Sequence, residues 1–335
     1  MARPEPAWRP PPRDGASASR VAVPAGPWAT VLGFLQARFP AVAATWPQRL
    51  ARGEVLDAQG RAWPADAPCP PGSLLWYWRS PPPEAAVPFE IELLHQDAQL
   101  LVVDKPHFLA VTPGGRHLQQ TVLLRLQRQL GLPDLAPMHR LDLETAGVMV
   151  FICQPAQRAA YHALLRGRQV HKVYEAVAPW RDDLVLPQVL RQRLADGQGP
   201  GPGQGHFMQV QVVDGAPNAE TEIALIARLA PSAGQAGALA PDGREPVALA
   251  HYRLIPHTGH RHQLRAQLNH LGLPIVGDRI YPVLWPDPAL GAVPDYSNPL
   301  QLLARELAFI DPVSGQARRF ASRRRLALVP QARDQ

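Results

Sequence analysis

The stretch that most constrains the fold runs from Met138 to Phe151 and joins a charged loop to a long apolar segment. Asp142 follows a His-Arg pair, and Ala146 and Gly147 then lead into a run of apolar residues that is typical of a buried strand. An aspartate before such a turn commonly caps it through hydrogen bonds to the backbone. The alternative is a carboxylate that a neighbouring arginine keeps ionised and that faces a substrate. These residues alone leave both interpretations open.

The composition bounds the classes of protein that this chain can form. Its 335 residues are enough for two domains. The net charge of +6 and the pI near 9.8 favour a polyanionic partner, nucleic acid above all. No apolar run has the length that a membrane helix needs, and Cys69 and Cys153 match neither a disulfide framework nor a metal site. We therefore expect a cytoplasmic protein without membrane contact, metal or cofactor, and we expect a monomer.

The basic residues are almost all arginines. Lysine and arginine total 34, yet lysine occurs only at Lys105 and Lys172. The ammonium of lysine is a flexible point charge, whereas the guanidinium of arginine is a rigid fork. The two lysines are therefore candidates for positions that require an ammonium.

Changes in composition divide the chain into segments. Residues 1–26 are rich in Pro and Arg and predict a disordered tail. Residues 27–80 predict two short helices followed by a hairpin, and 81–89 predict a stiff proline-rich linker. The main domain is predicted over 90–328, with a short tail over 329–335.

The predicted second helix of the N-terminal module carries Arg49 and Arg52. Two short helices and a hairpin resemble the small RNA-binding module first known from a small-subunit ribosomal protein, and this resemblance assigns RNA contacts to both arginines. The alternative is a capping subdomain in which the arginines are merely solvated. The sequence does not choose between the two.

Five motifs follow one another in the main domain. They are Lys105-Pro106; His139-Arg140-Leu141-Asp142 with Thr145 and Gly147; Lys172-x-Tyr174; Gly259-x-x-His262-Gln263-Leu264-Arg265; and Gly272-x-Pro274-Ile275-x-Gly277-Asp278-x-x-Tyr281. Their order and spacing resemble those of the RluA-type pseudouridine synthases, over residues 90 to about 325. The resemblance implies an α+β fold in which a mixed, largely antiparallel sheet surrounds a central catalytic cleft. It also implies cofactor-free isomerisation of specific uridines in ribosomal or transfer RNA.

The chemistry of that reaction explains the residue types. The uracil must leave its N-glycosidic bond, turn while captive and rejoin the ribose through carbon 5, which needs a catalytic carboxylate and a closed pocket. The resemblance makes Asp142 the essential carboxylate and Arg265 the cation that keeps it ionised. It makes Tyr174 the aromatic residue that stacks on the target base, with a hydroxyl placed to help move a proton.

The target base must also leave its stack in the RNA. By resemblance, Arg140 is the arginine that fills the vacated space. Further candidates for RNA contacts are Lys105, Lys172, Arg261 and Gln263, although a solvated strand lysine explains Lys172 equally well. Support of the loop that carries the catalytic carboxylate is predicted for His139, Thr145 and Gly147.

The chain departs from the family pattern at three places, one of which is Ala146, where Ser is common. The other two are larger. His107-Phe108 stand where a small residue and a glycine are usual, and His260-Arg261 stand where the family has Arg followed by Thr or Ser. Both departures concern the choice of substrate more than the reaction.

Two other functions remain as alternatives. His257, His260 and His262 lie close together like the ligands of a metal-dependent hydrolase, but residues two apart do not share a helix face, and no carboxylate follows before Asp278. The other alternative is a non-catalytic RNA-binding or ribosome-assembly protein on a synthase scaffold. The intact set of candidate catalytic residues argues against it.

Overall fold

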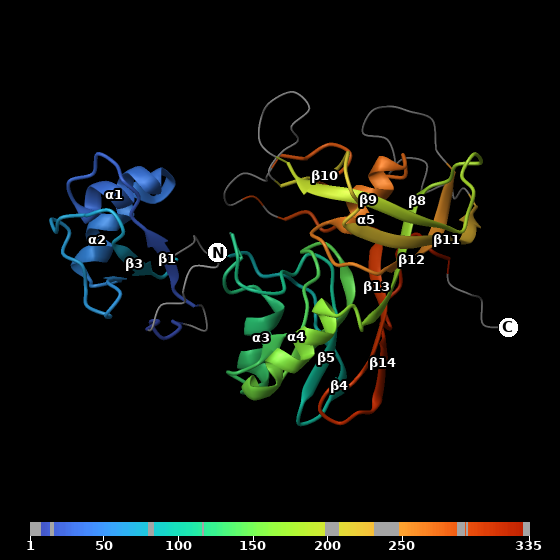
Figure 1. Ribbon diagram of the computed structural model, residues 1–335, viewed down its shortest axis with the longest axis horizontal. Coiled ribbons are helices and arrows are strands. Elements are labelled where there is room, and N and C mark those ends of the chain that lie inside the picture. The colour runs from blue at the N-terminus through green and yellow to red at the C-terminus, as the bar shows by residue number, and fades with distance from the viewer. Residues whose placement is uncertain are drawn as a thin grey trace. The chain divides into compact units, whose positions relative to one another are not determined.

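The computed structural model describes residues 8–13, 17–79, 84–115, 117–197, 208–230, 248–286, 292 and 294–330. The chain divides into two compact units, residues 1–84 with 113–119 and residues 85–112 with 120–335. Figure 1 shows the elements of both units. None of the described helices is long and apolar enough to cross a membrane.

The first unit combines short helices with a three-stranded antiparallel sheet. The sheet has the order β1-β3-β2. Thr30 caps α1, because its hydroxyl accepts a hydrogen bond from the backbone N–H of Gly33 at 3.1 Å. The elements are β1 (Ser19–Ala22), α1 (Val31–Arg38), the 3-10 helix η1 (Pro40–Thr45), α2 (Trp46–Ala51), β2 (Val55–Leu56) and β3 (Leu74–Tyr77). The two predicted helices and the predicted strand pair are present.

The prediction of a disordered tail over residues 1–26 is wrong for the described residues from 17 onward. β1 pairs with β3 along its whole length, and the side chain of Val23 is buried in the core of the unit. A four-residue strand whose partner lies far along the chain gives too short a periodic signal to outweigh the Pro and Arg around it. Residues 1–7 and 14–16 lie outside the described residues.

The second unit is built on one mixed sheet. Its order is β10-β9-β11-β12-β8-β13-β7-β5-β4, with β14 paired to β13 and β6 paired to β7. Every pair is antiparallel except β13 with β7. This confirms the predicted α+β fold with a largely antiparallel sheet. The strands are β4 (Glu92–Gln96), β5 (Leu100–Lys105), β6 (Ala136–Pro137), β7 (Ala146–Ile152), β8 (His171–Pro179), β9 (Gln188–Asp196), β10 (Val210–Val213), β11 (Ala219–Leu229), β12 (Leu249–Pro256), β13 (Leu302–Ile310) and β14 (Ala317–Ala321).

Helices cover both faces of the β5 and β7 part of the sheet. α3 (Val122–Leu130) packs on the face that contains Leu101 and Val103, whereas α4 (Arg158–Arg166), which follows the short η2 (Pro155–Gln157), packs on the face that contains Leu100 and Val102. Successive residues of a strand point to opposite faces of the sheet. Strands that are covered on both faces, such as β5 and β7, therefore need a continuous run of apolar residues.

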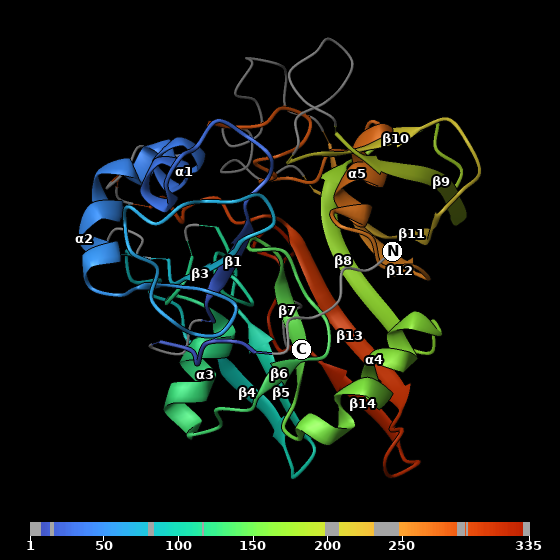
Figure 2. The same cartoon turned by 60° about the vertical axis from the view of Figure 1, so that its left-hand side comes forward.

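α5 (Gln263–His270) covers the other half of the sheet. Its Leu264 and Leu268 pack with Tyr252 and Leu254 of β12. Figure 2 shows β8 and β13 running side by side through the middle of the sheet. The two halves therefore meet at these central strands.

The boundary predicted between the two domains needs correction. Arg125 donates hydrogen bonds to the carbonyls of Val87 at 2.7 Å and Phe89 at 3.0 Å, and Val87 is buried in the core beneath α3. The second half of the predicted linker is therefore packed, and the second unit begins at residue 85 instead of 90. At the other end, Val329 of the predicted tail packs against an apolar cluster. Residues 80–83 and 331–335 lie outside the described residues.

Candidate active site

Asp142 lies in the loop that connects β6 to β7. The backbone N–H of Thr145 donates to the carbonyl of Asp142 at 3.2 Å and closes the turn. Gly147 follows with a φ of +117°, and a Cβ at this position would lie 2.2 Å from the carbonyl oxygen of Ala304. Only glycine fits this close approach of β7 to β13. Thr145 and Gly147 therefore shape this turn locally, and their predicted support of the site stays a prediction.

Arg265, near the start of α5, is the centre of a buried charge cluster. Its Nε and Nη2 donate to the two carboxylate oxygens of Asp278 at 2.7 and 2.6 Å, and Nη2 also donates to Glu144 at 2.9 Å. Its Nη1 donates to Oδ2 of Asp142 at 3.3 Å. Burial lowers the pKa of Arg265, but the hydrogen bonds and charge of Asp278, followed by the charges of Asp142 and Glu144, outweigh burial and raise it above its usual value. The arginine therefore keeps its charge.

Asp142 is the carboxylate of this cluster that stays open to solvent. Its side chain is 28% exposed, against 11% for Glu144 and 1% for Asp278. Asp278 accepts two hydrogen bonds from Arg265, and it also accepts hydrogen bonds from the backbone N–H groups of Ile280 and Tyr281. Asp142 has one contact with Arg265, so its carboxylate is held beside a permanent cation without being enclosed by it.

Two ring side chains border Asp142. Tyr174 of β8 packs between two apolar cores, and burial, followed by the charge of Asp142, raises the pKa of its hydroxyl. The phenol therefore stays protonated at neutral pH, where it can stack on a base or donate a hydrogen bond. Nε2 of His262 lies 3.9 Å from Oδ1 of Asp142, and burial lowers the pKa of this imidazole against the opposing charge of Asp142.

Lys105 is enclosed directly behind the loop. Its ammonium is fully buried and donates to the carbonyls of Pro106 at 2.9 Å, Leu109 at 2.8 Å and Leu143 at 3.0 Å. Three N–H donors meet three acceptors, a geometry that suits an ammonium better than a planar guanidinium. Burial lowers the pKa of Lys105 to about 7, although the charge of Asp142 opposes this. The prediction that Lys105 contacts RNA is wrong, because its donors are used inside the protein.

His107 holds the next carbonyl of the same loop. Its Nδ1 lies 2.6 Å from the carbonyl oxygen of Glu144 and so donates to it, and burial lowers the pKa of the ring to about 4. Phe108 has a φ of +64°, in the region that favours glycine, and its ring packs against Phe89 and Tyr296. Of these two residues, His107 therefore lies beside the loop of Asp142.

Comparison with known proteins assigns the family. A model of the RNA pseudouridylate synthase family matches residues 99–270. The chain belongs to this family. The dual-specificity RNA pseudouridine synthase RluA of Vibrio vulnificus is 31% identical over 237 residues, which cover 67% of this chain and 79% of the relative. The tRNA pseudouridine synthase C of Pasteurella multocida is 30% identical over 234 residues, which cover 68% and 88%.

One solved structure supports the fold of this pseudouridine synthase. Human RNA Pseudouridylate Synthase Domain Containing 1 aligns with a TM-score of 0.52 and 18% identity, over 71% of this chain and 85% of that one. The RluA-type assignment made from the five motifs is confirmed by the relatives. The resemblance of the first unit to a ribosomal-protein module stays a prediction.

Two further RNA contacts predicted for the synthase are wrong, because the side chains are buried. Gln263 is 4% exposed, and its amide is used by hydrogen bonds to Thr258 and Thr221 at 2.9 Å each. Arg49, in the first unit, is 7% exposed and donates to the carbonyl of Trp78. The sequence marks both residues as polar but gives no sign of their burial.

The other predicted RNA contacts lie where RNA could reach them. Arg52 and Arg140 are exposed, and Lys172 is half-buried. Arg261 is 44% exposed and forms an ion pair with Asp196 at 2.8 Å. Their roles stay predictions.

His139 is buried beside the strand that follows the loop. Its Nε2 accepts a hydrogen bond from the backbone N–H of Val150 at 3.3 Å, and burial, helped by the charge of Lys172, lowers its pKa to about 4. The ring is thus bonded to β7, and its predicted support of the site stays a prediction.

The three histidines behind the hydrolase alternative have three different partners. His257 contacts Glu222 at 2.7 Å, and His260 contacts the carbonyl of Asn218 at 2.8 Å. His262 lies beside Asp142. Over the described residues, no three His, Cys, Asp or Glu side chains gather as a metal site. The cluster that suggested a hydrolase is therefore not a ligand set.

Sequence reasoning missed two of the three carboxylates that Arg265 binds, and it also missed Arg279. Glu144 and Asp278 stand inside or beside the quoted motifs, but spacing alone does not reveal which arginine they bind. Arg279 was not singled out, although its Nε lies 3.9 Å from Glu144 and its guanidinium lies 5.6 Å from the ring centre of Phe108.

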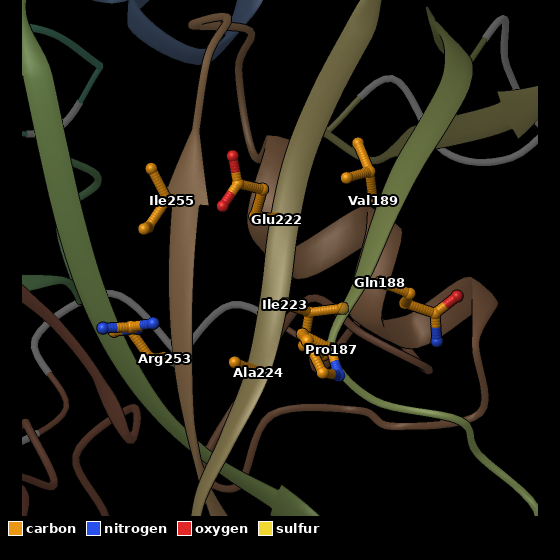
Figure 3. A pocket seen from close by; sticks show the side chains of 8 residues that line it. All are labelled: Pro187, Gln188, Val189, Glu222, Ile223, Ala224, Arg253 and Ile255. Carbon is orange, nitrogen blue, oxygen red and sulfur yellow. The ribbon is translucent and has the colours of Figure 1, made fainter.

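A hollow of about 280 Å³ lies over β9, β11 and β12 and is distinct from the site of Asp142 (Figure 3). Its lining includes Arg253, which pairs with Glu175 of β8. Glu175 follows Tyr174, and neighbouring residues of a strand point to opposite faces. The hollow is therefore on the opposite face of the sheet from Tyr174.

Proposed function

We propose that this pseudouridine synthase converts specific uridines in structured ribosomal or transfer RNA to pseudouridine, with Asp142 as the essential carboxylate. The observation that carries the proposal is the exposed carboxylate of Asp142 beside a buried arginine whose other donors are held by Glu144 and Asp278. The relatives named for ribosomal, transfer and dual-specificity RNA modification support the class of RNA.

The reaction is an isomerisation and needs no oxidant or reductant. The bond between N1 of uracil and C1′ of the ribose breaks, a bond from C5 to C1′ forms, the proton on C5 leaves, and N1 gains a proton. Asp142 supplies the carboxylate that acts on the ribose, and Arg265 holds a permanent positive charge beside it. Tyr174 stacks on the free base, and its protonated hydroxyl is available as a donor while the base turns.

The target base reaches the site by leaving its stack. Unstacking costs a few kcal/mol and is easiest in loops, so we propose a structured RNA with the uridine in a loop. Arg140 is exposed and stands two residues before Asp142, which supports the proposal that it enters the space that the base vacates. We also propose a cytoplasmic location, in keeping with the two unpaired cysteines, Cys69 and Cys153.

The test uses ribosomal and transfer RNA from a strain that lacks the gene, treated with the full-length protein and mapped chemically for pseudouridine. Wild-type protein should restore one or a few sites, Asp142→Asn should restore none, and the control Asp183→Asn, an exposed carboxylate paired with Arg181, should match wild type. RNA binding by wild type without any new pseudouridine would favour the non-catalytic alternative. Full activity of Asp142→Asn would refute the assignment of the carboxylate.

A further inference from the structure

His262 places an imidazole beside Asp142, and the proposed function assigns no step to it. Its Nε2 lies 3.9 Å from Oδ1 of Asp142, and 11% of its side chain is exposed. It stands at the N-cap of α5, three residues before Arg265. A substrate group that contacts the carboxylate of Asp142 therefore also lies within reach of this ring.

The stability of α5 does not explain a histidine at this position. His262 has a φ of +52°, in the left-handed region that is uncommon for residues other than glycine. The side chain of an N-cap residue commonly accepts a hydrogen bond from the first turn of the helix, yet this imidazole makes no such bond. Asparagine would tolerate the backbone conformation and also cap the helix. A strained residue beside a reactive carboxylate therefore points to a functional requirement.

The partners of the ring place a lone pair on the nitrogen that faces Asp142. Nδ1 of His262 lies 3.5 Å from the hydroxyl oxygen of Tyr281. That hydroxyl accepts a hydrogen bond from the backbone N–H of Val210 at 2.6 Å and donates its single hydrogen to the carbonyl of Val210 at 3.0 Å. A hydrogen bond between the ring and the phenol therefore needs the imidazole hydrogen on Nδ1. Nε2 is then a hydrogen-bond acceptor on the side of Asp142.

The isomerisation needs an acceptor at this place. Once C5 of the uracil has joined the ribose, the proton to be lost sits on the atom that is bonded to C1′, the carbon on which Asp142 acts. The C5–H bond breaks, and its electron pair forms the C5–C6 double bond. The pair displaced from the N1–C6 double bond binds a proton at N1. These changes balance without an oxidant or reductant, but the proton on C5 must move to a base.

Two neighbours of Asp142 cannot take this proton at neutral pH. Burial raises the pKa of the Tyr174 hydroxyl, so the phenol keeps its own proton and acts as a donor. Arg265 is a permanent cation with no lone pair to offer. A base for the proton on C5 must therefore come from another side chain.

The charges around His262 keep its ring neutral and ready to accept a proton. Burial lowers the pKa of the imidazole, and the charges of Arg265 and Arg261 act in the same direction. The charges of Asp142 and Asp278 oppose this lowering. The ring is thus neutral at neutral pH, and the carboxylates stabilise the imidazolium that forms when it accepts a proton.

We propose that Nε2 of His262 accepts the proton that leaves C5 of the target uracil. The imidazolium then releases this proton to solvent and is ready for the next turnover. Tyr174 as a donor and His262 as an acceptor thus serve opposite proton transfers. The inference rests on the proposed function, because it assigns one step of that reaction.

The main experiment compares full-length wild type with His262→Asn on an RNA that contains a mapped target uridine. Asparagine suits the left-handed N-cap but does not accept a proton at neutral pH. The substitution should lower kcat about a hundredfold with little change in KM. The control is His257→Asn, since that imidazole contacts Glu222, and it should keep the wild-type kcat. Unfolding temperatures check that both variants fold.

Two further measurements distinguish proton transfer from structural support. Deuterium at C5 of the target uridine should slow His262→Asn more than wild type, because removal of this proton limits the rate of the variant. The kcat of wild type should fall as the pH drops below about 6.5, where the imidazole gains a proton, and His262→Asn should lack this fall. Added imidazole should restore part of the kcat of His262→Ala.

The outcomes separate this inference from the proposed function. A wild-type kcat in His262→Asn, or a low kcat with the deuterium effect and the acid fall of wild type, would overturn the role of His262 while pseudouridine still forms with wild type. Absence of pseudouridine with wild type would refute the proposed function and, with it, this proton transfer.

Discussion

Two groups of basic side chains in the second unit differ in what balances their charge. The closed group consists of Lys105, His107 and Arg265. The hydrogen bonds that these side chains donate go to carbonyls or carboxylates of the protein itself. The open group consists of Arg140, Arg168 and Lys172. None of these three side chains has a carboxylate partner within the described residues. The closed group fixes the geometry of the loop around Asp142, whereas the open group is available to an external anion.

The sharpest contrast between the groups is predicted for the two lysines. Lys105→Met leaves three buried carbonyls without their donor, at about 1–3 kcal/mol for each unsatisfied group, so the free energy of unfolding should fall by at least about 3 kcal/mol. Lys172→Met removes a cation that donates one hydrogen bond, to the carbonyl of Thr258, and that has no carboxylate partner within the described residues. It should change the free energy of unfolding by about 1 kcal/mol or less. Urea unfolding of both variants measures the difference. An equal loss of unfolding free energy in the two variants would contradict the distinction between the closed and the open group.

Arg265→Lys tests whether the closed group needs a guanidinium. One ammonium cannot bond both oxygens of Asp278 and still reach Glu144 and Asp142, so kcat should fall about a hundredfold. Arg318→Lys is the matched control, since Arg318 also bridges two carboxylates, those of Asp97 and Asp311, outside the cluster around Asp142. The control should lose stability but keep kcat. If both variants lost a similar amount of activity, the loss in Arg265→Lys would have to be attributed to impaired folding.

His107→Ala should have a smaller effect on catalysis. It removes the donor to the carbonyl of Glu144 and loosens the loop of Asp142, which we expect to lower kcat about tenfold with little change in KM. His107→Asn can place an amide N–H near the position of Nδ1 and should recover most of the loss. Steady-state kinetics on a short RNA measure both variants. Failure of the asparagine to exceed the alanine would exclude a role for this hydrogen bond.

The same residue predicts a modest acid sensitivity. The pKa of His107 is about 4 in the folded protein and about 6.5 in an unfolded chain, so between these values the unfolded state binds more protons. Stability should therefore fall as the pH drops from about 6.5 towards 4, and less steeply in His107→Asn. Urea unfolding over this range gives the two slopes. His139 shares the same direction, so the slope should shrink without vanishing.

The sequence predicted those parts of the site that depend on residue type and order. Asp142, Tyr174 and Arg265 were chosen as candidates because they stand in motifs of characteristic spacing, and the structure brings them together. Their catalytic roles stay predictions. The same motifs led to wrong predictions at Lys105 and Gln263, because the identity of a polar residue does not show whether its side chain faces RNA or the protein interior. Burial depends on how distant segments pack, and a local pattern does not contain that information.

The parts of the fold that were missed have the same physical cause. β1 was overlooked because its partner β3 lies far along the chain, and its four residues are surrounded by Pro and Arg. The stretch from Ala85 to Phe89 was predicted as a linker from its prolines, although Arg125 binds its carbonyls. In both cases a tertiary contact overrode a local composition signal.

The parallel contact of Gly147 with Ala304 also bears on how the enzyme is made. The strand that carries Tyr174 and the strand that follows Asp142 do not pair with each other, because β13 is inserted between them. The ribosome releases β13 long after β7 and β8. A nascent chain therefore contains the candidate catalytic residues Asp142 and Tyr174 well before their strands can be assembled. Contacts between such distant segments form slowly, and the partly made sheet exposes unpaired strands in the meantime. Catalytic competence should therefore arise late in synthesis, when the strand from Leu302 to Ile310 joins the two halves.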